Sequence, residues 1–345
     1  MMKKNLKNIF RNKKVIITGG TGSLGRELTN IFLKNFNLKR LVIFSRDELK
    51  QSEMIKKYQH QDKREILRFF LGDVRDLSRM KFAMRDVDYV IHAAALKHVD
   101  LAEYNPLEYI NTNIIGAKNV IEAAFSCNVE KVIALSTDKA ANPINLYGAT
   151  KLASDKLFVS ANNISGNQKT RFAVVRYGNV ANSRGSVLPY FLKLHQNNSK
   201  NFPVTDKRMT RFWITLSQSA ELVLNSFYRM RGGEIFVPKI PSYRIMDVAK
   251  AIDPKIKTKV IGIRPGEKLH EEMITLSDSY RTLEFKNHFV ILPSTKLWDE
   301  EKYRAKNKKD IGIFNKKAFS YNSQNNKWFL SVQEIQNLIK SHVKK

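Results

Sequence analysis

Residues 15–25 read Val-Ile-Ile-Thr-Gly-Gly-Thr-Gly-Ser-Leu-Gly, an apolar run that passes directly into a glycine-rich loop. The spacing Gly20-x-Gly22-x-x-Gly25 fits the dinucleotide-binding fingerprint, and Gly19-x-x-Gly22-x-x-Gly25 fits a common variant of it. Glycines allow the tight turn and let the backbone approach a pyrophosphate, and the helix that follows offers N–H groups at its N-terminus. This strand–loop–helix context predicts a dinucleotide site.

Apolar runs recur along the first half of the chain, with room for a helix between them. They are Leu41–Phe44, Phe69–Leu71, Tyr89–His92, Val132–Leu135 and Phe172–Val175. Consecutive apolar residues are typical of parallel strands buried on both faces. The sequence therefore predicts an α/β fold, with a doubly wound parallel sheet and a smaller C-terminal substrate-binding lobe. We expect 1–180 and about 215–237 to form the Rossmann domain, and about 181–214 and 238–345 to form the lobe.

Bulk composition limits the class of protein. The 345 residues are 43% apolar and contain one cysteine, Cys127, which cannot form an intrachain disulfide, so we expect a reducing, cytoplasmic setting. No apolar run reaches the roughly 18 residues that span a bilayer, and no membrane insertion is expected. The formal net charge of +28 comes without a nucleic-acid-binding motif. We therefore expect no nucleic-acid partner and attribute the charge to attraction of phosphorylated substrates.

The end of the second apolar run decides which nicotinamide cofactor is expected. An acidic residue there would bond the 2′-hydroxyl of NAD, but this chain has Ser45 and Arg46, with Asp47 one residue later. Ser45, Arg46 and Lys50 could enclose a 2′-phosphate, and arginine suits that dianion. The sequence thus predicts NADP rather than NAD, while Asp47 could instead cap the next helix.

Two acid/base pairs follow the run that ends at Leu135. Tyr147 and Lys151, at i and i+4, share one face of a helix. The lysine ammonium can lower the tyrosine pKa from about 10, so that tyrosinate removes the proton of a substrate alcohol as hydride leaves carbon. Just upstream, Asp138 and Lys139 lie at the carboxyl edge of the sheet, where ligands bind. They form either a second acid/base pair or a solvated ion pair in a loop.

With these motifs in place, the sequence resembles the inverting UDP-N-acetylglucosamine 4,6-dehydratases, which are extended short-chain dehydrogenase/reductases. The resemblance covers nearly the whole chain and is carried by residues 45–50, 95–99, 136–151, 176–180, 183–187, 209–213 and 264–271. The retaining sugar 4,6-dehydratases carry Thr-Asp-Glu where this chain has Thr137-Asp138-Lys139. The lysine is therefore the sharpest mark of the inverting branch.

The resemblance implies a reaction on UDP-GlcNAc with NADP as cofactor. Tyr147 would deprotonate the C4 hydroxyl, Lys139 would remove the C5 proton from the 4-ketone, and Asp138 would protonate the departing C6 hydroxyl. Hydride would move from C4 to the cofactor and back to C6, giving UDP-2-acetamido-2,6-dideoxy-β-L-arabino-hex-4-ulose. Because Lys139 must act as a neutral amine, its pKa is expected below about 10.4.

The family also implies a lyase that opens pseudaminic acid biosynthesis, for flagellin or surface glycosylation, and a homo-oligomer that is a dimer or a hexamer. The spacing of His92, His98 and His270 fits no metal site, and none is expected.

The expected site residues follow from the motifs and the resemblance. The catalytic set is Thr137, Asp138, Lys139, Tyr147 and Lys151. The expected cofactor contacts are Gly19, Thr21, Gly22, Ser23, Leu24, Gly25, Ser45, Arg46, Asp47, Glu48, Leu49, Lys50, Asp73, Val74, Ala93, Lys97, Leu135, Ser136, Thr137, Tyr147, Lys151 and Val180. The expected sugar-nucleotide contacts are Lys97, Tyr147, Asn179, Arg184, Gly185, Ser186, Val187, Arg211, Arg264 and Glu267. Of these, Arg211, Arg264 and Glu267 would meet the diphosphate and nucleoside, or each could form a surface ion pair.

Two other functions remain open from the residues alone. A UDP-sugar 4-epimerase would use Tyr147 and Lys151 but would not need a base at Lys139 or an acid at Asp138. A non-catalytic NADP-binding module would need neither pair.

Overall fold

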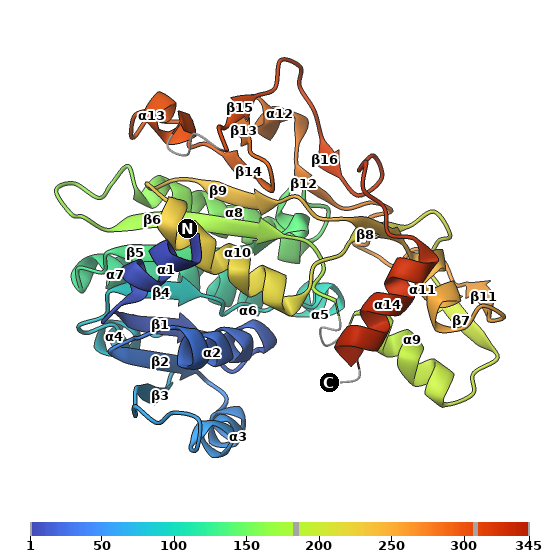
Figure 1. The fold of residues 1–345 in the computed structure, drawn as a ribbon, viewed down its shortest axis with the longest axis horizontal. Coiled ribbons are helices and arrows are strands. Elements are labelled where there is room, and N and C mark those ends of the chain that lie inside the picture. The colour runs from blue at the N-terminus through green and yellow to red at the C-terminus, as the bar shows by residue number, and fades with distance from the viewer. Residues whose placement is uncertain (1, 182–185, 306–309, 344–345) are drawn as a thin grey trace.

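The structure is a computed structural model that describes residues 2–181, 186–305 and 310–343. Its parallel sheet comprises β1 (Lys14–Thr18), β2 (Arg40–Ser45), β3 (Leu67–Leu71), β4 (Tyr89–His92), β5 (Lys131–Thr137), β6 (Arg171–Tyr177) and β9 (Ile235–Pro238). Beyond β9 the sheet continues antiparallel through β14 (His288–Ile291), β13 (Thr282–Glu284) and β15 (Ile313–Phe314). The order within the described residues is β15-β13-β14-β9-β6-β5-β4-β1-β2-β3 (Figure 1). The predicted doubly wound parallel sheet is confirmed.

Two apolar cores cover the two faces of this sheet. One face is packed by α4 (Leu77–Ala83), α7 (Gly116–Ser126) and α8 (Leu146–Ala161), and the other by α1 (Met2–Phe10), α2 (Ser23–Asn35), α3 (Glu48–Tyr58) and α10 (Leu216–Arg229). On β1, Ile16 packs into the first core, whereas Val15 and Ile17 pack into the second. Burial on both faces explains why the strands read as unbroken apolar runs.

A second group of elements lies at one side of the sheet, at the right of Figure 1. It contains α9 (Val187–Gln196), β7 (Asn201–Val204), β8 (Thr210–Phe212), β10 (Ser242–Arg244), α11 (Ile245–Ile252), β11 (Lys257–Val260) and α14 (Val332–Val343). Phe191 and Phe202 stack in its own apolar core, with ring centroids 4.8 Å apart. The short antiparallel pair of β12 (Glu272–Ile274) and β16 (Tyr321–Asn322) packs instead into a core of the large sheet. The remaining elements are α5 (Val99–Tyr104), α6 (Pro106–Ile110), a π-helical turn (Asn111–Ile115), the 3₁₀ turn η2 (Asp138–Ala140), α12 (Leu276–Ser279) and α13 (Glu300–Ala305).

The expected division into a Rossmann domain and a substrate lobe stays a prediction. At the level of strands, β9 from the stretch 215–237 joins the parallel sheet, next to β6. Three strands from the stretch 238–345, β13, β14 and β15, also lie in the large sheet. In the described part of the chain, no helix is both long and apolar enough to cross a membrane.

A buried arginine fastens the C-terminal segment to the sheet. Arg176 on β6 is 2% exposed and lies 3.2 Å from the Asp155 carboxylate of α8 and 3.4 Å from that of Asp278. It also donates to the carbonyl of Met273 on β12, at 2.9 Å. Losing one partner of a buried ion pair leaves an uncompensated charge. This contact therefore holds β12 over the carboxyl ends of β5 and β6.

Candidate active site

A cavity of about 890 Å³ lies at the carboxyl ends of the parallel strands. It is centred where β1 adjoins β4, the point at which the strand order reverses, and this is where open α/β sheets bind ligands. Most of the predicted site residues line it, including the glycine loop, Ser45, Arg46, Asp138, Lys139, Tyr147 and Lys151. The topology thus gathers motifs that are far apart in the sequence.

Some predicted residues lie elsewhere. Glu48 and Leu49 are exposed on the first turn of α3 and do not line the cavity, although Asp47 and Lys50 on either side of them do. Val187 opens α9 and packs against the apolar core of the second group of elements. Arg184 and Gly185 fall outside the described residues.

The glycine loop packs too closely against neighbouring backbone to accept side chains at Gly19 or Gly25. Gly19 has φ +65°, and a Cβ there would come within 2.8 Å of the Ala94 backbone. A Cβ on Gly25 would lie 2.2 Å from the carbonyl oxygen of Gly20, so only glycine lets α2 approach the loop. Helix α2 begins at Ser23 with no side-chain cap from Gly22. A bare backbone beside a helix N-terminus fits a dinucleotide diphosphate.

The end of β2 offers a hydroxyl and a cation. Ser45 Oγ lies 2.8 Å from Thr21 Oγ1, and Arg46 is about half exposed, 3.6 Å from the Asp73 carboxylate. Asp47 caps α3, since it accepts from the Lys50 amide at 2.9 Å and pairs with the Lys50 ammonium. The helix-cap interpretation of Asp47 is confirmed, and no carboxylate occupies the Ser45 position.

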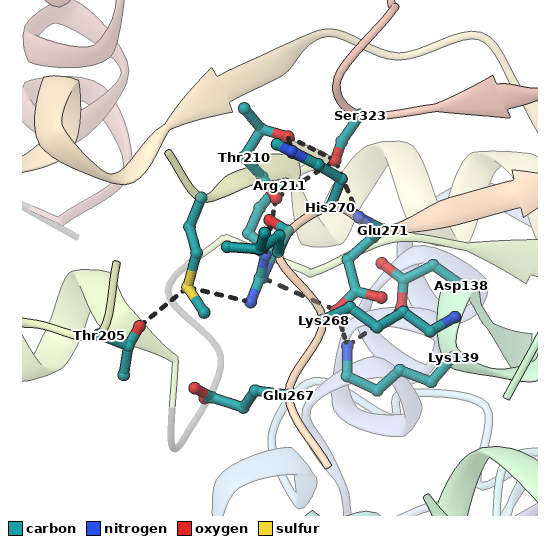
Figure 2. A network of polar contacts seen from close by, with 12 residues as sticks. Asp138, Lys139, Thr205, Thr210, Arg211, Glu267, Lys268, His270, Glu271 and Ser323 are labelled. Carbon is teal, nitrogen blue, oxygen red and sulfur yellow. Dashed lines mark hydrogen bonds and ion pairs between the residues drawn. The ribbon is translucent and has the colours of Figure 1, made fainter. Parts of the chain in front are cut away.

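The second acid/base pair is packed inside the protein. Asp138 is 1% exposed, and its Oδ1 accepts from the Thr137 hydroxyl at 3.0 Å. Lys139 Nζ lies 3.2 Å from Asp138 Oδ1 and 2.9 Å from Glu271 Oε1 (Figure 2). Glu271, which immediately precedes β12, is 2% exposed. The alternative of a solvated ion pair in a loop is therefore wrong.

These contacts reverse the expectation for the lysine. Burial alone would lower the pKa of Lys139, but the carboxylates of Asp138 and Glu271 outweigh it and raise that pKa above the ordinary value. The expected lowering of the Lys139 pKa is wrong, because sequence reasoning did not foresee a second carboxylate, that of Glu271, beside the lysine. For Asp138, burial and the nearby Glu271 charge both raise the carboxyl pKa. This carboxyl therefore holds a proton more readily than an exposed aspartate.

Tyr147 lies beside this pair on the first turn of α8. Asn145 caps that helix by accepting from the Gly148 amide at 2.7 Å, which fixes where the tyrosine enters the cavity. Burial raises the pKa of Tyr147 to about 12, while Lys139 and the Thr137 hydroxyl act in the opposite direction. Lys151 is also buried, which lowers its own pKa. The cation that counteracts the burial of the phenol is thus Lys139, whereas the sequence pointed to Lys151.

Cations and unpaired oxygens surround the rest of the cavity. Arg211 is 8% exposed and donates to the carbonyls of Thr210 and Leu269, so it is not a surface ion pair. Lys97 keeps contact with solvent, but partial burial lowers its pKa. Within the described residues, five lining side chains bury an oxygen that has no hydrogen-bond partner: Thr112 Oγ1, Asp138 Oδ2, Asn179 Oδ1, Glu267 Oε2 and Glu271 Oε2. Such groups ordinarily have a partner, so these point to a ligand rich in donors.

Sequence reasoning missed Glu271 and Lys268 as site residues. Both lie in the stretch 264–271 that carries part of the resemblance, from which only Arg264 and Glu267 were expected at the site. In the structure Lys268 donates to the Ala141 carbonyl at 2.8 Å, and Glu271 reaches Lys139 across 132 positions of sequence. The available signals were the resemblance over 264–271 and the apolar pair Met273 and Ile274, which marks a strand entering a core. Among the described residues, no group of His, Cys, Asp or Glu could hold a metal ion.

The chain is similar to known proteins over nearly its whole length. The profile of a family described as polysaccharide biosynthesis protein matches residues 15–293. A UDP-N-acetylglucosamine 4,6-dehydratase (inverting) of Campylobacter jejuni is 55% identical over 96% of this chain and 98% of its own. A UDP-glucose 4-epimerase of Rickettsia bellii is 40% identical over 96% of each chain.

Solved structures agree with the fold. Pen from Bacillus thuringiensis superposes with a TM-score of 0.85 and 35% identity, over 97% of this chain and 98% of that one. DesIV, a dTDP-glucose 4,6-dehydratase from Streptomyces venezuelae with NAD bound, superposes with a TM-score of 0.64 over 74% of this chain and 86% of its own. At 19% identity DesIV supports the fold alone.

Proposed function

The chain belongs to the polysaccharide biosynthesis protein family, and we propose that it is an NADP-dependent, C5-inverting UDP-N-acetylglucosamine 4,6-dehydratase. The observation that carries the proposal is the buried cluster of Asp138, Lys139 and Glu271 beside Tyr147, at the end of β5. A simple alcohol oxidation needs one proton-transfer group. This cluster supplies the further acid and base that removal of water requires.

The cavity suits a sugar nucleotide on two counts. Asp138, Asn179 and Glu267 present buried, unpartnered oxygens that hydroxyl and amide donors of a sugar would satisfy. The cations along the same wall suit a diphosphate, and they are Arg211, Arg264 and Lys268. The net charge of +28 adds a long-range attraction for an anionic substrate.

The cofactor would lie along the glycine loop. The loop backbone and the start of α2 would hold the diphosphate, Ser45 and Arg46 the adenosine end, and Lys151 the nicotinamide ribose. When bound there, NADP supplies a hydride acceptor for C4 and a hydride donor for C6. Because hydride returns to the sugar, the reaction has no net redox change.

The residues of the chain carry the proton steps. Tyr147 takes the proton of the C4 hydroxyl, and the resulting ketone acidifies the proton on C5. Transfer of one proton over the 3.2 Å contact from the Lys139 ammonium to Asp138 gives a neutral amine and a carboxylic acid. The amine then removes the C5 proton, the acid protonates the leaving C6 hydroxyl, and the ion pair is restored. Protonation of C5 on the opposite face by a solvent-derived proton, with the proton on Tyr147 returned to solvent, closes the proton balance and completes the inversion.

A UDP-sugar 4-epimerase is the second candidate, favoured by the 40% identity to the Rickettsia bellii protein. An epimerase returns hydride to C4 and needs no group that reaches C5 or C6. Incubation with UDP-GlcNAc followed by NMR separates the two. A 4-keto-6-deoxy sugar supports the dehydratase, whereas UDP-GalNAc as sole product overturns it.

The preference for NADP gives a separate prediction. Arg46→Ala is expected to weaken NADP binding about 10- to 100-fold, since a hydrogen bond to a charged group contributes about 1.5–3 kcal/mol. NAD has no 2′-phosphate, and its affinity should change only a few-fold. Fluorescence titration of the purified protein with each cofactor measures both, with the exposed Arg68→Ala as control. Equal affinity of the unaltered protein for NAD and NADP would remove Arg46 from this role.

The proposed compartment, oligomeric state and pathway rest on the family resemblance. The protein would be a cytoplasmic homo-oligomer, a dimer or a hexamer. It would supply the first intermediate of pseudaminic acid for glycosylation of flagellin or other surface molecules.

A further inference from the structure

Glu271 is a buried carboxylate that the reaction outlined above does not use. Its Oε1 lies 2.9 Å from Lys139 Nζ and 3.7 Å from Arg211 Nε, and its Oε2 has no partner among the described residues. Figure 2 shows Glu271 and Asp138 converging on the same lysine. Two carboxylates therefore share one ammonium inside the protein.

The backbone on both sides holds Glu271 in this place. Its amide donates to Ser323 Oγ at 2.9 Å, and its carbonyl accepts from the Ser323 amide at 2.7 Å. Ser323 Oγ also lies 2.7 Å from Thr210 Oγ1, next to Arg211 on β8 (Figure 2). β12 then pairs with β16 and is fastened to the sheet through Arg176. The carboxylate is thus held in the cavity wall by the start of β12 and by its contacts with Ser323.

We propose that Glu271 is a positioning residue for the elimination half of the reaction, where it fixes the Lys139 side chain and sets which of Asp138 and Lys139 carries the shared proton. The inference rests on the proposed dehydratase function and deepens it. Among the described residues, Glu271 forms no hydrogen bond or ion pair with Tyr147 or the glycine loop. The oxidation of C4 should therefore proceed without it.

The electrostatic consequence has a definite sign. A negative charge beside the pair favours the protonated form of each member, so Glu271 raises the pKa of both Asp138 and Lys139. Besides the pair, the charged or titratable groups that face this cluster are Arg211 from β8, Tyr243 from β10, Tyr147 from α8 and Lys268 from its own segment. None of these is a carboxylate that could replace Glu271. Loss of its charge must lower both pKa values together.

Glu271→Gln tests this, because it keeps the shape of the side chain and removes the charge. The rate of water elimination from UDP-GlcNAc, followed over pH, should keep its bell shape while both limbs move down by about one pH unit or more. Single-turnover C4 oxidation, read from the absorbance of the reduced cofactor, should stay within a few-fold of the unaltered protein. Glu272→Gln is the matched control, since it removes the same charge one residue away and outside the cavity lining. Its profile should not move.

If Glu271→Gln lowers the rate but leaves both limbs of the pH–rate profile in place, the role of Glu271 is merely structural and the inference is overturned. An unchanged rate and an unchanged profile would overturn it as well. If circular dichroism finds Glu271→Gln unfolded, Glu271→Asp decides, because it draws the carboxylate back from Lys139. Its limbs should move in the same direction by a smaller amount, and unmoved limbs overturn the inference. Failure of the proposed function is recognised separately, since the unaltered protein would then yield no dehydrated product.

Discussion

Lys139→Met is expected to slow water elimination by about 10²–10⁴-fold, the usual contribution of a positioned acid or base, while C4 oxidation is slowed less, through loss of the cation that counteracts the burial of Tyr147. Methionine keeps most of the length of the lysine but can neither take the C5 proton nor hold the proton that Asp138 donates. Reduced cofactor should therefore accumulate with a 4-keto sugar that retains its C6 hydroxyl. Stopped-flow absorbance measures the first, and mass spectrometry of the quenched sugar measures the second.

Two comparisons make this result specific to the lysine. Lys118→Met removes an exposed lysine of α7, paired with Glu122, and should leave both half-reactions unchanged. Because Lys139→Met leaves Asp138 and Glu271 without their cation, the stability of the variant needs a check by circular dichroism. Lys139→Arg keeps the charge but not an amine of suitable pKa, so it should fold well and remain slow. Normal elimination in either Lys139 variant would exclude the lysine as the C5 base.

Tyr147→Phe is expected to slow both half-reactions, again by about 10²–10⁴-fold, because it removes the group that takes the C4 hydroxyl proton. Without the ketone the C5 proton is not acidic, so elimination cannot begin. Neither reduced cofactor nor solvent exchange at C5 should then be detected. Tyr104→Phe, on an 86% exposed tyrosine of α5, is the matched control and should behave as the unaltered protein. Accumulation of reduced cofactor in Tyr147→Phe at the normal rate would contradict the assignment.

The two variants therefore differ in where the reaction stops. Lys139→Met stops after the cofactor is reduced, and Tyr147→Phe stops before it. An epimerase would show no such separation, because its hydride returns to C4 without any step at C5. This pattern distinguishes the dehydratase from the second candidate even before the product is identified.

The sheet could be predicted because its signal is local. Val15, Ile16 and Ile17 are apolar in succession because helices cover both faces of β1, and the same holds for the other central strands. The glycine loop could also be recognised from the sequence, because Gly19 and Gly25 lie where a Cβ would collide with backbone. Tyr147 and Lys151 were found for a similar reason, as their spacing alone puts them on one helical face.

The electrostatics of the site could not be predicted, because they depend on residues far apart in the sequence. Glu271 lies 132 positions from Lys139, and only the folded chain shows that it reverses the expected shift in the lysine pKa. Its sequence neighbours from Arg264 to Glu272 are mostly polar, and nothing local shows that β12 pairs with β16 and so brings Glu271 into the cavity wall. The short antiparallel strands β13, β14 and β15 were not predicted from the sequence for a related reason: their partners are set by tertiary packing.

The central claim is that this chain removes water from UDP-GlcNAc and inverts C5, and one measurement addresses it directly. The purified protein with catalytic NADP is incubated with UDP-GlcNAc in deuterated water, and the sugar product is examined by proton and carbon NMR. The account predicts a 4-keto-6-deoxy sugar with deuterium at C5 and the L-arabino configuration. Recovery of UDP-GalNAc alone, with no deuterium at C5, or of a 4-keto-6-deoxy sugar with the original C5 configuration, would contradict it.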